Sequence, residues 1–234
     1  MAKQEHRLPG VAVIGLGRFG RALALELEAG GTEVLGIDAN SELVQSLSGQ
    51  LTHLVVADST KEDALRQLSV HEFEQVVVGI GSDIEASILT TSLVLGFGVP
   101  NVWAKAISDA HGRILHQLGV GHVVYPEHDM GRRLAHLVRG KMLDFVEFED
   151  NFALVKTTPP SEVIGKPLGE TGIRSRHGVT VVAVKPRGSS FTYATEETVL
   201  QRGDVIIVAG DTRQVERFSE LSQLAQPRAI SSSG

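Results

Sequence analysis

The sequence predicts an α/β protein in which a doubly wound parallel sheet is followed by a smaller α+β domain. Apolar strand segments alternate with helical segments from residue 11 to about residue 126, a pattern typical of parallel sheets. A glycine-rich turn joins the first of these strands to the first helix. After residue 145 short strands and turns replace the alternation. We therefore expect a first domain at 1–140, a second at 145–224 and a loose tail at 225–234.

The glycine-rich turn has the pattern Gly-x-Gly-x-x-Gly and consists of Gly15, Gly17 and Gly20, directly after the apolar strand at 11–14. Glycines permit a tight turn and a close approach of the backbone to phosphate, whose charge then sits on free N–H groups at the helix N-terminus. The pattern lies between a strand and a helix, so we predict a nucleotide-binding turn. The alternative is a tight strand–helix connection without a ligand.

Two side chains inside this turn carry separate expectations. Arg18 occupies a position where the motif requires no charge, and a guanidinium there could donate charge-assisted hydrogen bonds to phosphates. An arginine solvated at the start of the helix is the equally good alternative. Phe19 is counted with the candidate site as a residue of the loop, although we expect it to pack beneath the loop rather than to touch a ligand.

The second strand, residues 32–38, ends in a carboxylate that follows Gly20 by 18 residues, where a dinucleotide-binding fold places an acid on the ribose hydroxyls. Asp38 would repel a 2′-phosphate, which disfavours NADP, and its alternative role is to cap the next helix. Asn40 either assists at the ribose or shapes the turn. Ser41 is the expected N-cap of that helix.

The third and fourth strands, residues 52–58 and 75–81, end on the adenine side of the expected crevice. Asp58 and Ser59 close the third strand and Gly81 closes the fourth, so these residues are candidates to line an adenosine site. Capping is a strong alternative for Asp58 and Ser59, because Ser59 also begins a capping-box pattern for the next helix.

One uncharged segment, residues 86–104, has about the length needed to span a bilayer. Glycine, proline and asparagine interrupt it between Gly96 and Asn101, where a spanning helix would have to continue. We therefore interpret it as a buried helix beginning near Asp83, a turn and a buried strand at 101–106 of a soluble protein.

Two oppositely charged residues lie near the phosphate side of the crevice. Lys105 is close to the end of the fifth strand, and Glu127 directly follows the sixth strand at 122–126. A glutamate that faced phosphates would be repelled unless a cation such as Mg²⁺ lay between them or unless it served a neighbouring subunit. A surface charge at the start of a helix is an equally good interpretation of Glu127.

The composition excludes several classes of function. The net charge of −6 and the lack of a basic run disfavour a nucleic-acid partner, and the absence of cysteine excludes disulfides and thiolate metal sites. The absence of cysteine is compatible with a cytosolic location, and the N-terminal residues lack the apolar core of a signal peptide. There is no His-Glu-x-x-His, Gly-x-Ser-x-Gly or P-loop motif. A nucleotide site without catalytic residues therefore argues against an enzyme.

A helix expected at about 129–142 has no parallel strand after it to which it could return. Its apolar residues fall on one side and are Met130, Leu134, Leu137, Val138 and Met142. The segments that follow alternate short strands with turns, and a helix at about 211–224 closes the second domain.

The chain resembles the RCK family, the regulators of potassium conductance, over about residues 8–224. The resemblance rests on GLGRFG, GID, VVADST, AKA and YPE, which occur in that order, and on IGKPLGETGIRSRHGVTVVAVKPRG followed by ETVLQRGDVIIVAGD. It implies a Rossmann-like RCK N-domain, a crossover helix and a small RCK C-domain. A free-standing chain of this size is similar to the cytosolic gating subunits of Ktr/Trk-type potassium transporters.

These gating subunits are not enzymes. The resemblance implies a homo-octameric ring of dimers beneath a dimeric membrane pore, with ATP or ADP, or NAD(H) in some members, in each N-domain. Carried over to this sequence, the glycines, Arg18 and Lys105 would hold phosphates, Asp38 the ribose, and Asp58 and Gly81 the adenosine. Glu127 would help to bind a divalent cation beside the γ-phosphate, often across the dimer.

The resemblance also implies roles for the second half of the chain. The helix at about 129–142 would cross to the partner subunit, with its apolar side as an interface. Some members bind cyclic di-AMP between two C-terminal domains, and Ile173 and Arg174 occupy the matching apolar and phosphate-contacting positions. Thr180 departs from the pattern, because some binders carry asparagine there.

Two other functions stay open at this point. An NAD-dependent oxidoreductase would need an acid or base in the second domain that no motif shows. A nucleotide sensor could instead regulate something other than potassium transport.

Overall fold

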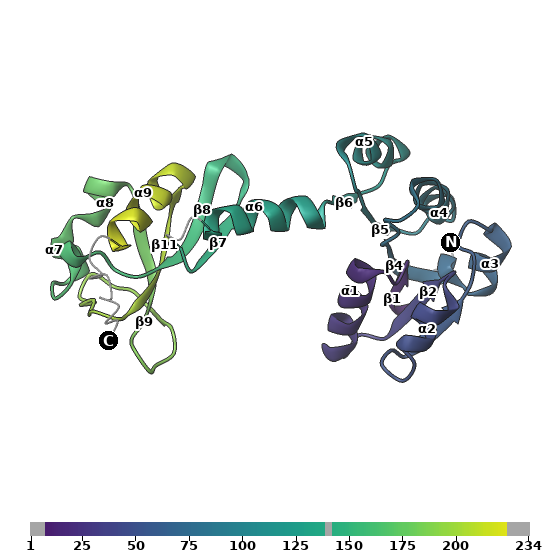
Figure 1. Cartoon of the computed structure of the whole chain (residues 1–234), viewed down its shortest axis with the longest axis horizontal. Helices are drawn as coiled ribbons and strands as arrows, with labels where there is room; N and C mark the ends of the chain where they lie inside the picture. Colours follow the sequence, from purple (N-terminus) through teal and green to yellow (C-terminus); the bar gives the residue numbers. More distant parts are fainter. Residues whose placement is uncertain (1–7, 139–141, 224–234) are drawn as a thin grey trace, which may run out of the picture. The chain divides into compact units, whose positions relative to one another are not determined.

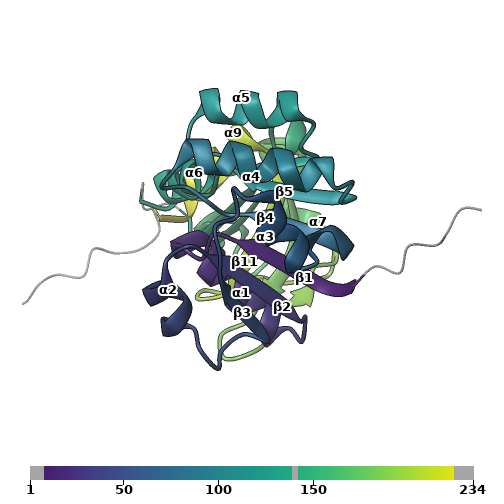
Figure 2. The same ribbon diagram turned by 90° about the vertical axis from the view of Figure 1, so that its right-hand side faces the viewer.

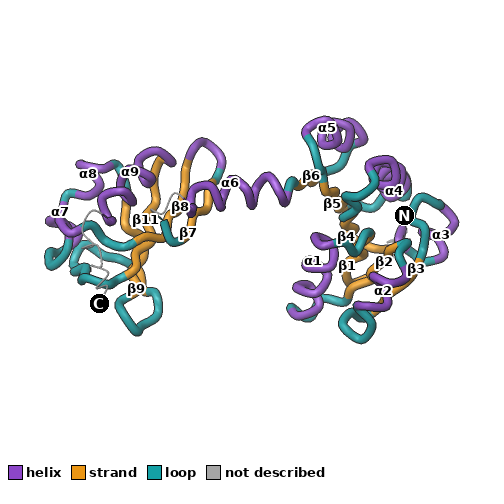
Figure 3. The backbone as a smooth tube through the Cα atoms, viewed as in Figure 1, coloured by secondary structure: helices purple, strands orange, loops and turns teal. Residues whose placement is uncertain are grey.

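The computed structural model describes residues 8–138 and 142–223, and the expected tail at 225–234 lies outside these residues. The chain divides into two compact units, residues 1–128 and 129–234 (Figure 1). In the first unit helices and strands alternate along the chain, whereas the second unit also contains strands that follow one another without a helix between them (Figure 3).

The first unit is built on a six-stranded parallel sheet with the order β3-β2-β1-β4-β5-β6, which confirms the predicted doubly wound sheet. Its strands are β1 (Leu8–Ile14), β2 (Val34–Asp38), β3 (His53–Val56), β4 (Phe73–Val78), β5 (Asn101–Lys105) and β6 (His122–Val124). Its helices are α1 (Arg18–Ala29), α2 (Ser41–Ser46), α3 (Glu62–Gln67), α4 (Ile84–Gly96) and α5 (Asp109–Leu118), with a short 3₁₀ turn at Val70–Glu72.

Helices cover both faces of this sheet because alternate residues of each strand point to opposite sides. Ala12 and Ile14 of β1 belong to a core with residues of α3 and α4, whereas Val11 and Val13 belong to a core with residues of α1 and α2. Two views show α4 and α5 on one side of the strands and α1 and α2 on the other (Figures 1 and 2). From β1 the sheet grows through β2 to β3 in one direction, and from β4 it grows through β5 to β6 in the other. The switch point therefore lies between β1 and β4, and such a point opens a crevice at the carboxyl ends of the strands.

The uncharged segment at 86–104 forms most of α4, a turn and β5, as predicted. The buried side of α4 includes the small polar residues Ser87, Thr90 and Thr91. Within residues 8–138 and 142–223, no helix is long and apolar enough to cross a membrane.

Two predicted helix caps are wrong. Asn40, not Ser41, caps α2, because its side-chain oxygen accepts hydrogen bonds from the N–H groups of Glu42 and Leu43 at 2.9 and 3.3 Å. The capping box from Ser59 also does not form, since α3 begins at Glu62 with Lys61 as its N-cap residue. The hydroxyl of Ser59 instead lies 2.9 Å from the hydroxyl of Thr90 in α4, a contact between distant segments that no local pattern reveals.

The second unit contains a five-stranded antiparallel sheet with the order β10-β9-β11-β8-β7, as expected for an α+β domain. Its strands are β7 (Asp144–Glu147), β8 (Phe152–Thr157), β9 (Thr180–Lys185), β10 (Thr192–Tyr193) and β11 (Val205–Asp211). Its helices are α7 (Leu168–Thr171), α8 (Ile173–His177) and α9 (Thr212–Gln223), with 3₁₀ turns at Glu149–Asn151 and Ser161–Val163. Val215 and Phe218 of α9 join buried residues of β8 and β11 in one core.

The unpaired helix of the prediction is α6 (Pro126–Val138), which contains the boundary between the units. The expected end at Met142 is wrong, because Met142 is not helical, and residues 139–141 lie outside the described ones. The predicted apolar side is divided. Leu137 and Met142 pack against the core of the second unit, whereas Met130, Leu134 and Val138 are exposed.

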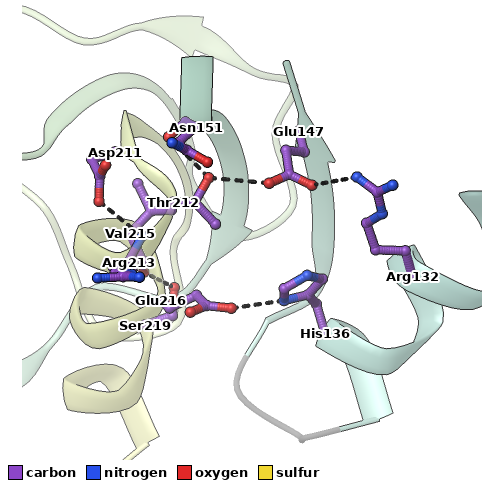
Figure 4. Close-up of polar contacts among 10 residues, drawn as sticks. All are labelled: Arg132, His136, Glu147, Asn151, Asp211, Thr212, Arg213, Val215, Glu216 and Ser219. Carbon is purple, nitrogen blue, oxygen red and sulfur yellow. Dashed lines mark hydrogen bonds and ion pairs between the residues drawn. The ribbon is translucent and has the colours of Figure 1, made fainter. Parts of the chain in front are cut away.

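Polar contacts hold the C-terminal half of α6 to the second unit (Figure 4). Nη1 of Arg132 donates to Oε2 of Glu147 in β7 at 3.2 Å. Nδ1 of His136 lies 2.7 Å from Oε1 of Glu216 in α9, and the His136 ring stacks on Phe145 with centroids 4.0 Å apart. This half of α6 therefore belongs to the second unit.

Candidate functional site

A cavity of about 780 Å³ lies in the first unit, where the strands of the parallel sheet end. The residues predicted for the nucleotide site, apart from Gly20, line it together: Gly15, Gly17, Arg18, Phe19, Asp38, Asn40, Asp58, Ser59, Gly81, Lys105 and Glu127. The fold thus brings residues from the ends of all six strands into one crevice, although the first and the last of these residues are more than 100 positions apart in the sequence.

The three glycines of the turn differ in what a side chain at each position would meet. Gly15 has φ +91°, and a Cβ atom there would lie 2.8 Å from the backbone nitrogen of Ile80. A Cβ atom on Gly20 would collide with the carbonyl oxygen of Gly15, so Gly20 supports the turn from behind although it does not line the cavity. A Cβ atom on Gly17 would meet no protein atom within 4 Å. Gly17 therefore leaves free the space through which a ligand could approach the backbone.

The N-terminus of α1 has no side-chain cap and can therefore accept an anion. Gly17 is its N-cap residue and supplies no side-chain hydrogen bond, and the first turn contains no acidic residue. By contrast, Asn40, Asp83 and Ser108 cap the neighbouring helices α2, α4 and α5 with their side chains. The first N–H groups of α1 therefore remain available, together with the positive end of the helix dipole.

Asp38 supports the glycine turn as well as lining the cavity. Its Oδ2 accepts a hydrogen bond from the N–H of Leu16 at 2.6 Å, and its Oδ1 accepts one from the N–H of Asn40 at 2.8 Å. The alternative role considered for Asp38, capping α2, is taken by Asn40. The oxygen of Asn40 is used in the cap, so its amide nitrogen is the group that remains to donate to a ligand.

On the side predicted for adenine, Asp58 is fixed by a local turn. Its Oδ1 accepts hydrogen bonds from the N–H and the hydroxyl of Thr60 at 3.0 and 2.6 Å. The hydroxyl hydrogen bond is the main cause that lowers the pKa of Asp58, so the group is a charged acceptor at neutral pH. Ser59 is buried and paired with Thr90, which leaves Asp58 as the more accessible of the two.

On the side predicted for phosphate, Lys105 and Glu127 form an ion pair with Nζ and Oε1 only 2.6 Å apart. The side chain of Lys105 is 9% exposed and that of Glu127 is 62% exposed. The hydrogen bond from Lys105 is the main cause that lowers the pKa of Glu127, and the charge of Arg18 lowers it further. Nζ of Lys105 also lies 5.8 Å from the centroid of the Phe19 ring.

The acidic side chains here do not form a preassembled metal site. Within the described ranges no group of three or more His, Cys, Asp or Glu side chains could hold a metal ion. Glu127 offers one accessible carboxylate at the cavity, which suits Mg²⁺ when phosphate and water oxygens complete its octahedron.

Sequence reasoning missed a further set of cavity residues: Ile37, Ala39, Leu43, Thr60, Gly79, Ile80, Ser82, Asp83, Ala86 and Ile107. Several of them directly follow predicted strands, and this position at the carboxyl end was a usable signal. Gly79 had a second signal, the sequence Gly-Ile-Gly, because a Cβ atom at Gly79 would lie 3.0 Å from the carbonyl oxygen of Gly15. No local sequence pattern predicts the ion pair between Lys105 and Glu127, which are 22 positions apart.

A second cavity, of about 610 Å³, lies in the second unit and is lined by residues of α7, α8, β9 and the segment after β10. Ile173 and Arg174, the two residues predicted for a second ligand, both line it. Ile173 is 4% exposed, and Nε of Arg174 donates to the hydroxyl of Thr180 at 3.2 Å. Thr180, the residue that departs from the expected pattern, therefore positions the arginine.

Comparison with known proteins agrees with this architecture. Residues 11–126 match the TrkA-N domain, and residues 152–223 match the TrkA-C domain. Ktr system potassium uptake proteins A and C of Bacillus subtilis (strain 168) are 33% and 36% identical to the chain. The alignments cover 88% and 89% of this chain and 94% and 95% of those proteins.

Among solved structures, the GsuK channel bound to NAD has the same fold, with a TM-score of 0.65 and 21% identity. The match covers 93% of this chain and 40% of the GsuK chain, so this chain spans well under half of that channel's length.

Proposed function

This chain belongs to the family of proteins in which a TrkA-N domain is followed by a TrkA-C domain, and we propose that it is the nucleotide-sensing regulatory subunit of a potassium uptake system. The observation that carries the proposal is the cavity of the first unit, where an uncapped helix N-terminus, Arg18 and Lys105 gather beside Asp38. The full-length similarity to Ktr system potassium uptake proteins supplies the transport context.

The ligand of this cavity is an adenine nucleotide, ATP or ADP, with NAD(H) as the other candidate. Free N–H groups of α1 and the charges of Arg18 and Lys105 suit a chain of phosphates. Asp38 at the end of β2 suits a ribose and repels a 2′-phosphate, which excludes NADP from the proposal. Asp58 and Gly81 contribute the adenosine end of the cavity.

A divalent cation such as Mg²⁺ binds with the nucleotide. Glu127 supplies the protein's carboxylate, and the phosphates supply further oxygens, which is how Mg²⁺ is commonly bound beside nucleotides. The ion neutralises the repulsion that Glu127 would otherwise exert on the phosphates.

The chain works as an oligomer that docks on a membrane-embedded potassium transporter subunit, on the cytoplasmic side of the membrane. We propose a ring of dimers, an octamer in the form suggested by the resemblance to the RCK family. The exposed Met130, Leu134 and Val138 of α6 support a contact with a partner subunit, because these apolar side chains gain from burial.

Gating requires that the nucleotide bind one shape of the assembly more tightly than the other, since a ligand of equal affinity for both shifts nothing. The γ-phosphate of ATP and its cation provide that difference when they contact Arg18 and Glu127. In this proposal the chain has no catalytic step, and an NAD-dependent oxidoreductase is the alternative.

The cavity of the second unit takes a second ligand, and cyclic di-AMP is our candidate. Ile173 offers an apolar contact and Arg174 a guanidinium for phosphate, both lining the same cavity. Binding of cyclic di-AMP at this cavity would affect nucleotide binding in the first unit only if the oligomer couples the two cavities.

A thermal-shift panel on the purified protein tests the proposal. ATP, ADP, NAD⁺, NADH, NADPH and cyclic di-AMP are compared with and without Mg²⁺. A ligand at a hundred times its Kd stabilises the protein by about 2.7 kcal/mol, which raises the melting temperature measurably. We expect shifts with ATP and ADP and an effect of Mg²⁺ on ATP, whereas a shift with NADH alone would favour the oxidoreductase.

A matched pair of variants locates the binding. Arg18→Ala should reduce the ATP shift, whereas Arg21→Ala, on the same helix but outside the cavity, should not. Potassium flux in liposomes that contain a Ktr-type pore subunit then tests the role in transport. Flux that does not respond to the protein and nucleotide would contradict it.

A further inference from the structure

The ion pair between Lys105 and Glu127 puts a carboxylate of the protein where a phosphate would be expected. Oε1 of Glu127 lies 2.6 Å from Nζ of Lys105, and both residues line the nucleotide cavity. A carboxylate and a phosphate oxygen offer an ammonium group the same kind of charge-assisted hydrogen bond. The ammonium of Lys105, the cationic contact that an anion in this cavity would use, is therefore paired with Glu127.

The two partners differ in how freely they can move. Lys105 is 9% exposed, and its ammonium lies against Gly81, where an added Cβ atom would be 3.1 Å from Nζ. Glu127 is 62% exposed in the first turn of α6. Breaking the pair would leave the carboxylate free to turn to water at little cost, whereas Lys105 would stay in the cavity. Glu127 is therefore the partner that leaves.

We propose that Glu127 competes with the nucleotide's phosphate for Lys105, and that a divalent cation promotes nucleotide binding by drawing Glu127 away from the lysine. This inference rests on the proposed nucleotide site and concerns its regulation. Each ligand removes one partner of the pair and frees the other: the cation takes the carboxylate, and the phosphate takes the ammonium. The two ligands thereby help each other to bind, as linkage requires.

A simpler explanation makes a different prediction. If Glu127 stayed in place and merely repelled phosphate, Lys105 would screen that repulsion, and Glu127 would weaken binding most strongly when Lys105 is absent. If Glu127 competes for Lys105, it weakens binding only when the lysine is present. A third possibility, in which Glu127 acts only as a ligand of the cation, predicts no effect of Glu127 when the cation is removed.

A double-mutant cycle separates these explanations. The affinities of ATP and ADP are measured by calorimetry, in EDTA and in Mg²⁺, for the wild type, Glu127→Gln, Lys105→Met and the double variant. We expect Glu127→Gln to tighten Mg²⁺-free binding about fivefold, the upper value for an ion pair with one exposed and one nearly buried partner. Addition of Mg²⁺ should then improve binding less than in the wild type.

In the Lys105→Met background, the same Glu127→Gln change should tighten Mg²⁺-free binding by less than about twofold, which is small against the roughly fivefold gain expected in the wild-type background. An equal or larger gain there would overturn the inference in favour of repulsion. No gain in the wild-type background would overturn it in favour of a purely cation-binding role.

Two controls keep the outcomes apart. Glu85→Gln removes a similar exposed charge in α4, outside the cavity, and should leave both affinities unchanged. Melting temperatures of all the variants establish that they are folded. Failure of the wild type to bind ATP, ADP or NAD⁺ would instead reject the proposed nucleotide site itself.

Discussion

The two cavities of this protein are built in different ways. In the first unit, the lining comes from the carboxyl ends of parallel strands, and a helix N-terminus without a side-chain cap faces it. In the second unit, the lining comes from two short helices and from residues of β9 and the segment after β10. Arg174 is one of two charged side chains that line this second cavity, the other being Glu196.

The two cavities therefore differ in how far their shape depends on the backbone rather than on side chains. In the first cavity, the turn at 15–20 is determined by steric limits on its glycines, so a change there affects the fold and the ligand together. In the second cavity, the predicted contacts depend on side chains alone. Substitutions should therefore separate binding from stability easily in the second unit and with more difficulty in the first.

The largest effect is expected from Gly20→Ala. The new methyl group would collide with the carbonyl oxygen of Gly15, so the variant should lose about 1–3 kcal/mol of unfolding free energy and its nucleotide binding. Chemical denaturation measures the first effect and calorimetry the second.

Gly17→Ala is the matched control for this prediction. Its φ is −60°, and its methyl group would meet no protein atom within 4 Å, so stability should stay within about 0.5 kcal/mol of the wild type. Nucleotide affinity should nevertheless fall, because the methyl group occupies the approach to the backbone. A Gly20→Ala protein as stable as Gly17→Ala would contradict the steric argument.

A smaller effect is expected from Asp38→Ala. It leaves the N–H groups of Leu16 and Asn40 without their acceptor, which should cost about 1–2 kcal/mol of stability, and nucleotide affinity should fall as well. Asp204 of the second unit is the matched residue, since its Oδ2 accepts from the N–H of Gln201 at 2.8 Å. Asp204→Ala should lower stability but not nucleotide affinity; equal loss of affinity in both variants would show that Asp38 acts only through stability.

Two arginines sharpen the comparison between the cavities. Arg18→Ala should weaken ATP binding about tenfold and leave cyclic di-AMP unaffected, while Arg174→Ala should do the reverse, since each loses one charged contact to phosphate. Both side chains are exposed, so stability should change little. Calorimetry with each ligand on each variant measures this. Lack of cyclic di-AMP binding by the wild type would remove the proposal for the second cavity.

The smallest expected effect is on the loss of folding stability at low pH. Hydrogen bonds from Lys105 and from Arg133 lower the pKa of Glu127 in the first unit and of Asp144 in the second below their ordinary values of 4.5 and 3.8. A carboxyl whose pKa is lower in the folded state stabilises the fold above the unfolded-state pKa. This contribution disappears as the pH falls through the folded-state pKa.

Both pairs are partly exposed, so solvent screening limits the contribution of each pair to about 1 kcal/mol at most. Glu127→Gln and Asp144→Asn should each slightly flatten the loss of stability between about pH 5 and pH 3. Denaturation curves at a series of pH values, in low and high salt, check this. A steeper loss in either variant would contradict the assigned sign.

Much of the fold could be predicted from the sequence because its signals are local. The strand–turn–helix pattern around Gly15 and the alternation up to residue 126 identified the parallel sheet, and strand ends identified most of the charged cavity residues. Helix caps were less predictable. Asn40 and Ser41 are both good capping residues, and the choice between them depends on backbone angles set by the turn after Asp38.

By itself the sequence therefore determined the fold class, the order of the two units and the residue types that gather at the strand ends, because strand and helix periodicity and glycine sterics act over a few residues. Only the tertiary structure decided which of these groups bond to one another. Lys105 and Glu127 are separated by 22 residues, and they meet because parallel strands bring their carboxyl ends to one edge of the sheet. The same holds for Asp38 and Leu16. Hydrogen bonds and ion pairs need contact within about 3 Å, and packing, rather than any local pattern, creates that proximity.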